Sequence, residues 1–286
     1  MDRLEYTTPN DRFYDFCLWE YKPVASFENK LRSSSLLFSA LDSVDFDNRI
    51  YNLIKAIRDG IGVSRTVWGV KKLGNEISLE FYFYDYNRRD RDLSISRLIY
   101  ILSPFFHCNI EVNEKHHYFM FSLDMHGDLV LGTENLSEIH MYIGNPGSTV
   151  SSGICYSLKE TGTSLENFYF FFDAEKEMDD IMDKACCSAH LDTDVISVDK
   201  IFWPELKSCK RIVVSNKQSC DAIYFSGVYV DQLIFFLKKM KYPVKIISFV
   251  EANRHLLDHQ LYDVAFDYRM EGKDLKILKS SYYGIF

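Results

Sequence analysis

The stretch ISLEFYFYDY, residues 77–86, places several side chains that could do chemistry on one face of a predicted strand. Its even positions carry hydroxyl groups and a carboxylate, among them Glu80, Tyr82 and Tyr84, whereas its odd positions are apolar. Because successive side chains of a strand point to opposite faces, this alternation predicts one apolar face and one face of tyrosine and acid. A carboxylate there could position or deprotonate a reacting group, and aromatic rings could stabilise a cation by cation–π attraction.

The same alternation recurs on the predicted strands at residues 116–125, 138–144, 166–174 and 210–217. The polar residues of these four faces are, in that order, His116, Tyr118, Ser122 and Asp124; Glu138, His140 and Tyr142; Asn167, Tyr169 and Asp173; and Arg211, Ser215 and Lys217. We expect these faces to enclose a wide polar chamber, which Tyr224 and Tyr283 also line, with the apolar faces turned outward to helices. The alternative is an open sheet with its polar face in solvent.

Six basic residues could reach that chamber through strand alternation or position. They are Arg65, Lys71, Arg211, Lys217, Lys276 and Lys279. Several cations from different strands in one volume would suit a diphosphate, because lysine and arginine form strong charge-assisted hydrogen bonds to phosphate oxygens. A single lysine is more often a solvated surface residue, so only convergence would indicate a site. The candidate diphosphate-binding residues are Arg65, Lys71, Arg211, Lys217 and Lys279.

Ten strands in five adjacent pairs, with helices between most pairs, must position these residues. The strands are predicted at residues 64–72, 77–86, 116–125, 138–144, 152–158, 166–174, 210–217, 221–228, 261–269 and 275–286. Strands joined by short turns are antiparallel, and helices that return between hairpins cover one face of the sheet. We therefore predict an α+β fold, a ten-stranded antiparallel β-barrel with a polar lumen surrounded by helices. It forms a single domain over residues 1–286, in which residues 1–45 are an N-terminal extension of unassigned structure.

This order of elements resembles the ABBA prenyltransferases, which have a ten-stranded antiparallel barrel with a polar lumen and a coat of helices. The chain length and the ending DVAFDYRMEGKDLKILKSSYYGIF, residues 263–286, resemble the peptide prenyltransferases of cyanobactin pathways. The resemblance covers about residues 46–286 as an order of elements. It implies transfer of a dimethylallyl or similar group from its diphosphate to a peptide side chain, with Mg²⁺ as cofactor. The lack of a predicted helix between the second and third strand pairs fits a barrel open to peptides at one end.

In such an enzyme the candidate residues take distinct roles. Glu80 is the candidate catalytic carboxylate, and Glu138 and His140 are candidates for binding the acceptor. The rings expected to line the lumen and shield an allyl cation are Tyr82, Tyr84, Tyr142, Tyr169, Tyr224 and Tyr283. For Glu80 a purely structural role is the alternative, as partner of Arg65 or Lys71 on the adjacent strand. For the whole chain two alternatives stay open: a barrel that binds a small ligand or peptide without catalysis, and a prenyltransferase for a free small aromatic compound.

Charge and cysteine content restrict the remaining classes of function. A net charge of −8 argues against a nucleic-acid-binding protein, and the longest basic cluster, NRRDR at residues 87–91, is interrupted by Asp90. Seven cysteines without a CxxC pair predict a reduced, cytoplasmic protein. No apolar run reaches the length of a membrane-spanning helix, so no membrane partner is expected.

Patterns typical of protein-bound metals are weak. The adjacent pairs His116–His117 and Cys186–Cys187 would point in different directions on a strand or helix, so no zinc site is expected. The segment DDIMD, residues 179–183, is similar to the magnesium-binding motif of isoprenyl-diphosphate synthases. Those enzymes are all-helical, however, and acidic residues at a helix start favourably complement the helix dipole. We therefore expect a structural role for this segment.

Overall fold

The computed structural model describes residues 3–44, 46–87 and 91–286, so part of the basic cluster at residues 87–91 lies outside the described residues. Ten strands close into one barrel, in which each strand pairs antiparallel with the next along the chain and the last pairs with the first. The barrel strands are β3 (Thr66–Leu73), β4 (Glu76–Tyr84), β5 (Tyr118–Met125), β6 (Ile139–Gly144), β7 (Ser151–Lys159), β8 (Gly162–Asp173), β9 (Arg211–Lys217), β10 (Asp221–Val228), β11 (Tyr262–Glu271) and β12 (Asp274–Ile285). The predicted ten-stranded antiparallel barrel is therefore confirmed.

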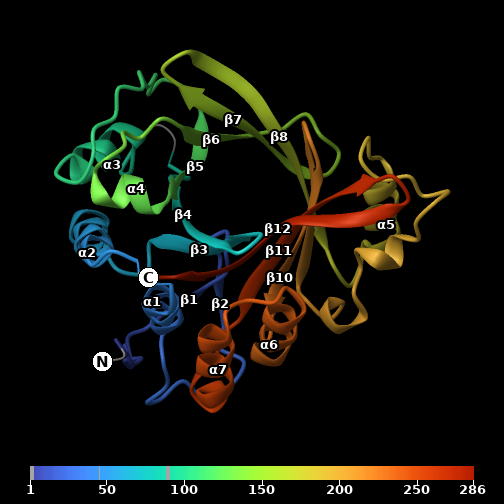
Figure 1. Cartoon of the computed structure of the whole chain (residues 1–286), viewed down its shortest axis with the longest axis horizontal. Coiled ribbons are helices and arrows are strands. Elements are labelled where there is room, and N and C mark those ends of the chain that lie inside the picture. Colours follow the sequence, from blue (N-terminus) through green and yellow to red (C-terminus); the bar gives the residue numbers. More distant parts are fainter. Residues whose placement is uncertain (1–2, 45, 88–90) are drawn as a thin grey trace.

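Helices surround the barrel on its outer side (Figure 1). In the described part of the chain they are α1 (Ser34–Ser43), α2 (Arg49–Ile61), α3 (Ile95–Leu102), α4 (Gly127–Leu131), α5 (Met178–Cys186), α6 (Val230–Lys239), α7 (Val244–Ala252) and α8 (Arg254–Leu257), with short 3₁₀ turns at Val198–Lys200 and Pro204–Leu206. Helix α2 shows the reason for this placement, because the apolar residues that recur at helical spacing, Ile50, Leu53, Ile54 and Ile57, are all buried. Between β6 and β7 the chain makes only a turn, as predicted.

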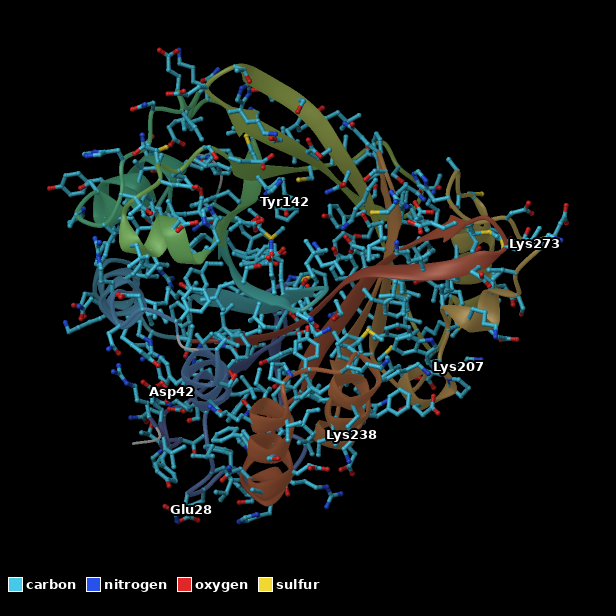
Figure 2. The ribbon with its side chains drawn as sticks, in the orientation of Figure 1. Glu28, Asp42, Tyr142, Lys207, Lys238 and Lys273 are labelled. Carbon is cyan, nitrogen blue, oxygen red and sulfur yellow. The ribbon has the colours of Figure 1, made fainter. Side chains whose placement is uncertain are left out.

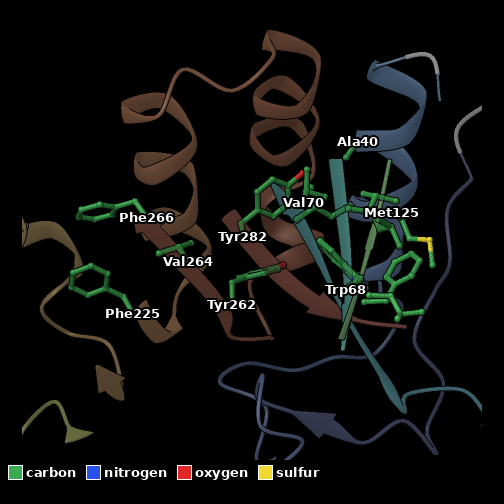
Figure 3. Packing of buried hydrophobic residues seen from close by; sticks show 14 of the residues in the cluster. Ala40, Trp68, Val70, Met125, Phe225, Tyr262, Val264, Phe266 and Tyr282 are labelled. Carbon is green, nitrogen blue, oxygen red and sulfur yellow. The ribbon is translucent and has the colours of Figure 1, made fainter. Parts of the chain in front are cut away.

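The main hydrophobic core lies between the outward faces of the strands and the helices. Phe81 and Phe83 of β4 are fully buried in it, as predicted from the alternation in residues 77–86. Figure 3 shows the same arrangement at Val264 and Phe266 of β11, whose side chains lie beneath the helices. A core outside the barrel leaves the inward faces of the strands for polar and aromatic side chains.

One predicted lumen residue lies on the opposite face of the sheet. The register between β5 and β6 shifts between Tyr118 and Met120, so Phe119 joins the lumen cluster whereas Tyr118 is fully buried in the outer core. There the Tyr118 hydroxyl accepts a hydrogen bond from the backbone N–H of Ile95. The prediction for Tyr118 was wrong because a β-bulge adds one residue to a strand and reverses the alternation beyond it. His116 also differs from its prediction, because it lies in a turn before β5 begins.

The N-terminal extension contains a small hairpin that the sequence did not predict. Strand β1 (Phe13–Tyr14) pairs antiparallel with β2 (Glu20–Tyr21). Within the connecting residues, Asp15 Oδ1 accepts hydrogen bonds from the backbone N–H groups of Cys17 (2.9 Å) and Trp19 (3.0 Å). Leu18 has a φ of 55°, in the left-handed region. These contacts hold residues 15–19, called here the hairpin tip, in a tight turn.

Candidate functional site

Five tyrosines form a belt around the lumen, called here the tyrosine belt. Alternate strands supply them: Tyr82 from β4, Tyr142 from β6, Tyr169 from β8, Tyr224 from β10 and Tyr283 from β12. From Tyr283 through Tyr82, Tyr142 and Tyr169 to Tyr224, successive ring centres are 6.0, 6.4, 5.8 and 6.0 Å apart. Figure 2 shows Tyr142 inside the ring of strands. Five of the six tyrosines predicted to line the lumen therefore contact one another there.

Burial keeps the tyrosine belt neutral. Burial raises the pKa of Tyr82 well above its usual value, and the nearby charge of Glu80 raises it further. The Tyr82 hydroxyl donates a hydrogen bond to Glu80 Oε2 (2.7 Å), and the Tyr283 hydroxyl lies 3.5 Å from the same oxygen. The ring of Tyr283 lies over Gly69 of β3, where a β-carbon would be only 2.6 Å from a ring atom. The belt thus presents neutral rings, the groups that stabilise a cation by cation–π attraction.

A network of buried charges adjoins the belt at Glu80. The Lys71 ammonium lies 3.0 Å from Glu80 Oε1 and 2.5 Å from Asp124 Oδ2, and the Lys279 ammonium lies 3.7 Å from Glu80 Oε1. Burial by itself would raise the pKa of Glu80, but the charges of Lys71 and Lys279 hold it well below its usual value. The ion pair between Glu80 and Lys71, one of the alternatives considered from the sequence, is therefore present. A carboxylate with so low a pKa is a weak proton acceptor.

The network continues across the lumen to Asp267. The Lys217 ammonium lies 2.8 Å from Asp267 Oδ2, and the Lys279 ammonium lies 3.5 Å from the same atom. Burial by itself would raise the pKa of Asp267, but Lys217 and Lys279 lower it below its usual value. For Lys279, burial would lower the pKa, and the charges of Asp267 and Glu80 reverse this and raise it. Asp267 and Lys279 are therefore held in their charged forms.

The lysine network, as these residues are called here, has balanced charge. It consists of Lys71, Lys217 and Lys279 with Glu80, Asp124 and Asp267, three cations and three anions. Five of the six side chains are mostly buried, whereas Asp124 is 46% exposed and opens the network to solvent. Three of the six basic residues named from the sequence thus converge, as a diphosphate site requires, but each is already paired with a carboxylate.

The other three basic residues lie elsewhere. Arg65 lines a separate cleft of about 540 Å³ beside the hairpin tip, and Lys276 is exposed and paired with Glu271. Arg211 lies at the mouth of the barrel that the hairpin tip covers. The expectation that Arg65 and Arg211 join the lysines is wrong for one shared reason. Each is six residues from a network lysine along the same extended segment, which corresponds to about 20 Å.

Glu138 and His140, the candidates for binding the acceptor, lie near each other. His140 Nε2 is 3.6 Å from Glu138 Oε1, and Lys159 lies 3.2 Å from that oxygen. His140 pairs in register with Ser122, two residues before Asp124 on β5. These two residues are therefore on the same side of the tyrosine belt as the lysine network, and their role as acceptor ligands stays a prediction.

The hairpin tip binds the opposite mouth of the barrel. The Tyr84 hydroxyl donates to the carbonyl oxygen of Phe16 (2.5 Å), and the Tyr86 hydroxyl donates to the carbonyl oxygen of Cys17 (2.7 Å). Arg211 donates to Asp15 Oδ2 at 2.6 Å. Its guanidinium also lies 4.3 Å from the centre of the Trp19 ring. The sixth predicted tyrosine, Tyr84, is thus a ligand of the hairpin tip.

The side chain of Phe16 reaches the tyrosine belt from this mouth. Its ring centre is 6.4 Å from that of Tyr224, in a stacked arrangement, and 6.1 Å from that of Tyr283. Phe16 lines a lumen cavity with Tyr142 and Tyr169, and this cavity has a volume of only about 20 Å³. That is enough space for about one water molecule. The cavity is too small for a hydrocarbon group while Phe16 lies in it.

Asp263 lies beneath the hairpin tip and has an unusual pKa. Burial is the largest cause that raises it, and the neighbouring charge of Asp15 adds to the effect, so the pKa is about 7. The carboxyl group also accepts hydrogen bonds from the backbone N–H of Gly227, at 3.1 Å, and from that of Phe16. The mouth therefore combines one guanidinium, from Arg211, with two closely placed carboxyl groups.

Protein-bound metal is not supported by these residues. Within residues 3–44, 46–87 and 91–286, no three histidine, cysteine, aspartate or glutamate side chains are grouped so that they could hold a metal ion. The lumen carboxylates instead bind lysines. The DDIMD segment lies at the start of α5, where Asp179 and Asp180 occupy the first turn. This is the structural position expected for it.

Comparison of the chain with protein-family models and with curated protein sequences found no match. The barrel by itself does not identify a family, because one fold can serve unrelated functions. Among the helices of the described residues, none has both the length and the apolar character needed to cross a membrane.

Proposed function

We propose that the chain is a prenyltransferase that moves a dimethylallyl or similar group from its diphosphate to a side chain of a peptide. The observation that carries this proposal is the direct contact between the lysine network and the tyrosine belt, made by the hydrogen bond from Tyr82 to Glu80. Transfer of an allyl group requires both parts: cations for the diphosphate and neutral aromatic rings for the allyl cation that its departure creates.

In the proposed reaction the bond between the allyl carbon and the diphosphate oxygen breaks, and the electron pair leaves with the diphosphate. Lys71, Lys217 and Lys279 stabilise the charge of that leaving group through charge-assisted hydrogen bonds. The rings of the tyrosine belt stabilise the allyl cation until an acceptor atom of the peptide bonds to it. The acceptor proton passes to the departing diphosphate, a stronger base than Glu80 with its low pKa. Glu80 then acts by positioning Lys71 and Lys279.

Mg²⁺ is not assigned a step in this scheme. The lumen carboxylates are paired with lysines and the described residues offer no group of metal ligands, so the site does not fit a metal held by the protein. Mg²⁺ used in the reaction would be brought by the diphosphate. All seven cysteines are free thiols, which fits the cytoplasmic location proposed from the sequence.

The test is a transfer assay with purified protein, dimethylallyl diphosphate, MgCl₂ and a mixed peptide library, read by mass spectrometry. We expect peptides that gain one dimethylallyl group. Lys217→Met should reduce product about 10- to 100-fold, the effect of losing a hydrogen bond to a charged group. Lys276→Met is the matched control and should leave product unchanged, because Lys276 lies outside the network. No product with the folded protein, or equal product from both variants, would contradict the proposal.

The main alternative is a barrel that binds a ligand without catalysis. The balanced charge of the lysine network favours it, because paired lysines already have counter-ions. Titration calorimetry with inorganic pyrophosphate separates the two functions. A prenyltransferase should bind pyrophosphate with an affinity that falls in Lys217→Met, whereas a barrel for neutral ligands should show no heat of binding with either chain. A free aromatic acceptor in place of a peptide would be revealed by adding such compounds to the same transfer assay.

A further inference from the structure

The hairpin tip occupies the mouth of the barrel in the manner of a bound peptide. Its main chain is held by two hydroxyl donors of the barrel, from Tyr84 and Tyr86, which bind the carbonyl oxygens of Phe16 and Cys17. Such contacts to backbone atoms do not depend on side-chain identity, so another peptide could receive them. The mouth therefore supplies a general means of holding a turn of polypeptide.

Two further contacts give the mouth a preference for particular side chains. Arg211 binds the carboxylate of Asp15 through a charge-assisted hydrogen bond of 2.6 Å. The Phe16 ring, next in the chain, lies against Tyr224 and Tyr283 of the tyrosine belt. An acidic residue followed by an aromatic one at the tip of a turn satisfies both.

The position of Phe16 also relates to the lysine network. Tyr283 contacts Phe16 on one side and lies 3.5 Å from Glu80 of the network on the other. The mouth that the hairpin tip covers is called here the hairpin mouth. A side chain that enters through it would thus contact the tyrosine belt on the face opposite the lysines. This is the arrangement that brings an acceptor to an allyl group whose diphosphate lies on the lysines.

Resting on the proposed function, we propose that this mouth of the barrel is the site that binds the acceptor peptide. The acceptor is a tight peptide turn that presents an aromatic side chain directly after an acidic residue. The hairpin tip competes with this peptide for the mouth. With the tip in place the cavity of about 20 Å³ excludes an isoprenoid group and an acceptor alike. The acceptor peptide displaces residues 15–19, and the mouth then binds it through the same groups.

The test uses the full chain and a labelled peptide copy of residues 13–21, with serine at the position of Cys17 to prevent oxidation. The double variant Asp15→Asn, Phe16→Ala weakens the tip and leaves the barrel wall intact. In fluorescence anisotropy it should bind the peptide at least about tenfold more tightly than the wild-type chain, because apparent affinity scales with the fraction of open mouths. Glu20→Gln, an exposed change on the same hairpin, is the matched control and should bind as wild type does. Adding Arg211→Gln to the double variant should reduce binding at least about tenfold.

Hydrogen exchange on the wild-type chain gives an independent result that requires no variant to fold. Excess unlabelled peptide should speed exchange of the amides of residues 15–19 and leave the barrel strands unchanged. Equal peptide binding by the double variant and the wild-type chain would overturn the proposal. So would unchanged exchange of the tip at saturating peptide, or binding that Arg211→Gln does not weaken. No isoprenoid is present in these experiments, so they stand whether or not transfer is observed.

Discussion

Asp263 and Asp267 lie four residues apart on the same inward face of β11, and burial acts to raise the pKa of both, yet their net pKa shifts are opposite. At the lysine network, Lys217 and Lys279 hold the pKa of Asp267 below its usual value. At the hairpin mouth, burial and the charge of Asp15 raise the pKa of Asp263 to about 7. The difference is in the partners: Asp267 faces cations fixed on barrel strands, whereas Asp263 faces a second carboxylate on a segment that lies against the mouth.

The contrast suggests that the two ends of the lumen were built for different tasks. The lysine network has each charge paired and belongs to the barrel wall, so removing one member should lower the free energy of unfolding of the whole barrel. The hairpin mouth has two carboxyl groups for one guanidinium, so its contacts should be easier to release. Four changes, from the largest expected effect to the smallest, test this comparison.

Lys279→Met should have the largest effect on stability. It removes the cation shared by Glu80 and Asp267 and leaves two buried carboxylates with one lysine each. Removing one partner of a buried ion pair costs about 3–5 kcal/mol, so the free energy of unfolding in urea should fall by that amount. Lys276→Met on the same strand should not move the urea midpoint. A fall of less than about 1 kcal/mol for Lys279→Met would mean that water reaches the network and replaces the missing ammonium group.

Glu80→Gln tests the role of that carboxylate. It changes the network from neutral to a net charge of +1, so pyrophosphate should bind several-fold more tightly in calorimetry. The free energy of unfolding should fall by about 2–3 kcal/mol, because Lys71 and Lys279 lose a charged partner. If Glu80 is instead a general base, binding should stay unchanged while turnover falls roughly 10²–10⁴-fold. The two measurements on one variant decide between these roles.

Asp263→Asn should alter how stability depends on pH. The pKa of Asp263 is raised by folding, so its contribution to stability is complete below about pH 4, where the unfolded carboxyl is also protonated, and is lost as pH rises through about 7. The neutral asparagine should therefore raise the melting temperature at pH 8 by about 2–5 °C and have little effect at pH 4. Asp267→Asn is the contrasting variant and should lower stability at pH 8. Equal melting curves for Asp263→Asn and the wild-type chain at pH 8 would show that ionisation of Asp263 does not destabilise the folded protein.

Tyr84→Phe should produce the smallest change, confined to the hairpin mouth. It removes one hydrogen bond to the carbonyl oxygen of Phe16, worth about 1 kcal/mol. Amides of residues 15–19 should exchange about fivefold faster, while amides of the barrel strands keep their protection. Phe83→Leu, on the outward face of the same strand, should do the reverse by lowering global stability. Faster exchange throughout the barrel in Tyr84→Phe would show that mouth and wall open together.

Alternation along single strands was enough to predict the tyrosine belt, and the order of paired strands and helices was enough to predict the barrel. Tyr82, Tyr142, Tyr169, Tyr224 and Tyr283 share inward faces because side chains of a strand alternate, and no knowledge of neighbours was needed. Tyr118 failed because a bulge at Phe119 depends on pairing with β6, which one strand's sequence does not encode. Alternation gives the face on which a residue lies but not its distance along the strand, so it does not separate Arg65 and Arg211 from lysines about 20 Å away.

The hairpin tip was the part that sequence patterns could least reveal. Its strands have two residues each, too short for any period, and its position depends on contacts with Tyr84, Tyr86 and Arg211. The sequence did contain a pattern that indicates the two lumen carboxyl groups of β11. Asp263, Ala265 and Asp267 alternate along β11, so two acids facing the lumen could have been expected beside the lysines and the tyrosines.

The pairing of β12 with β3 has a consequence for how the protein reaches its native state. Nine of the ten strand contacts join neighbours along the chain and can form while synthesis proceeds, but β3 and β12 meet only after the segment Asp274–Ile285 has been made. Until then the sheet has two free edges, and unpaired edges promote aggregation. Because β12 also carries Lys279 and Tyr283, the step that removes those edges is the same step that completes the lysine network and the tyrosine belt.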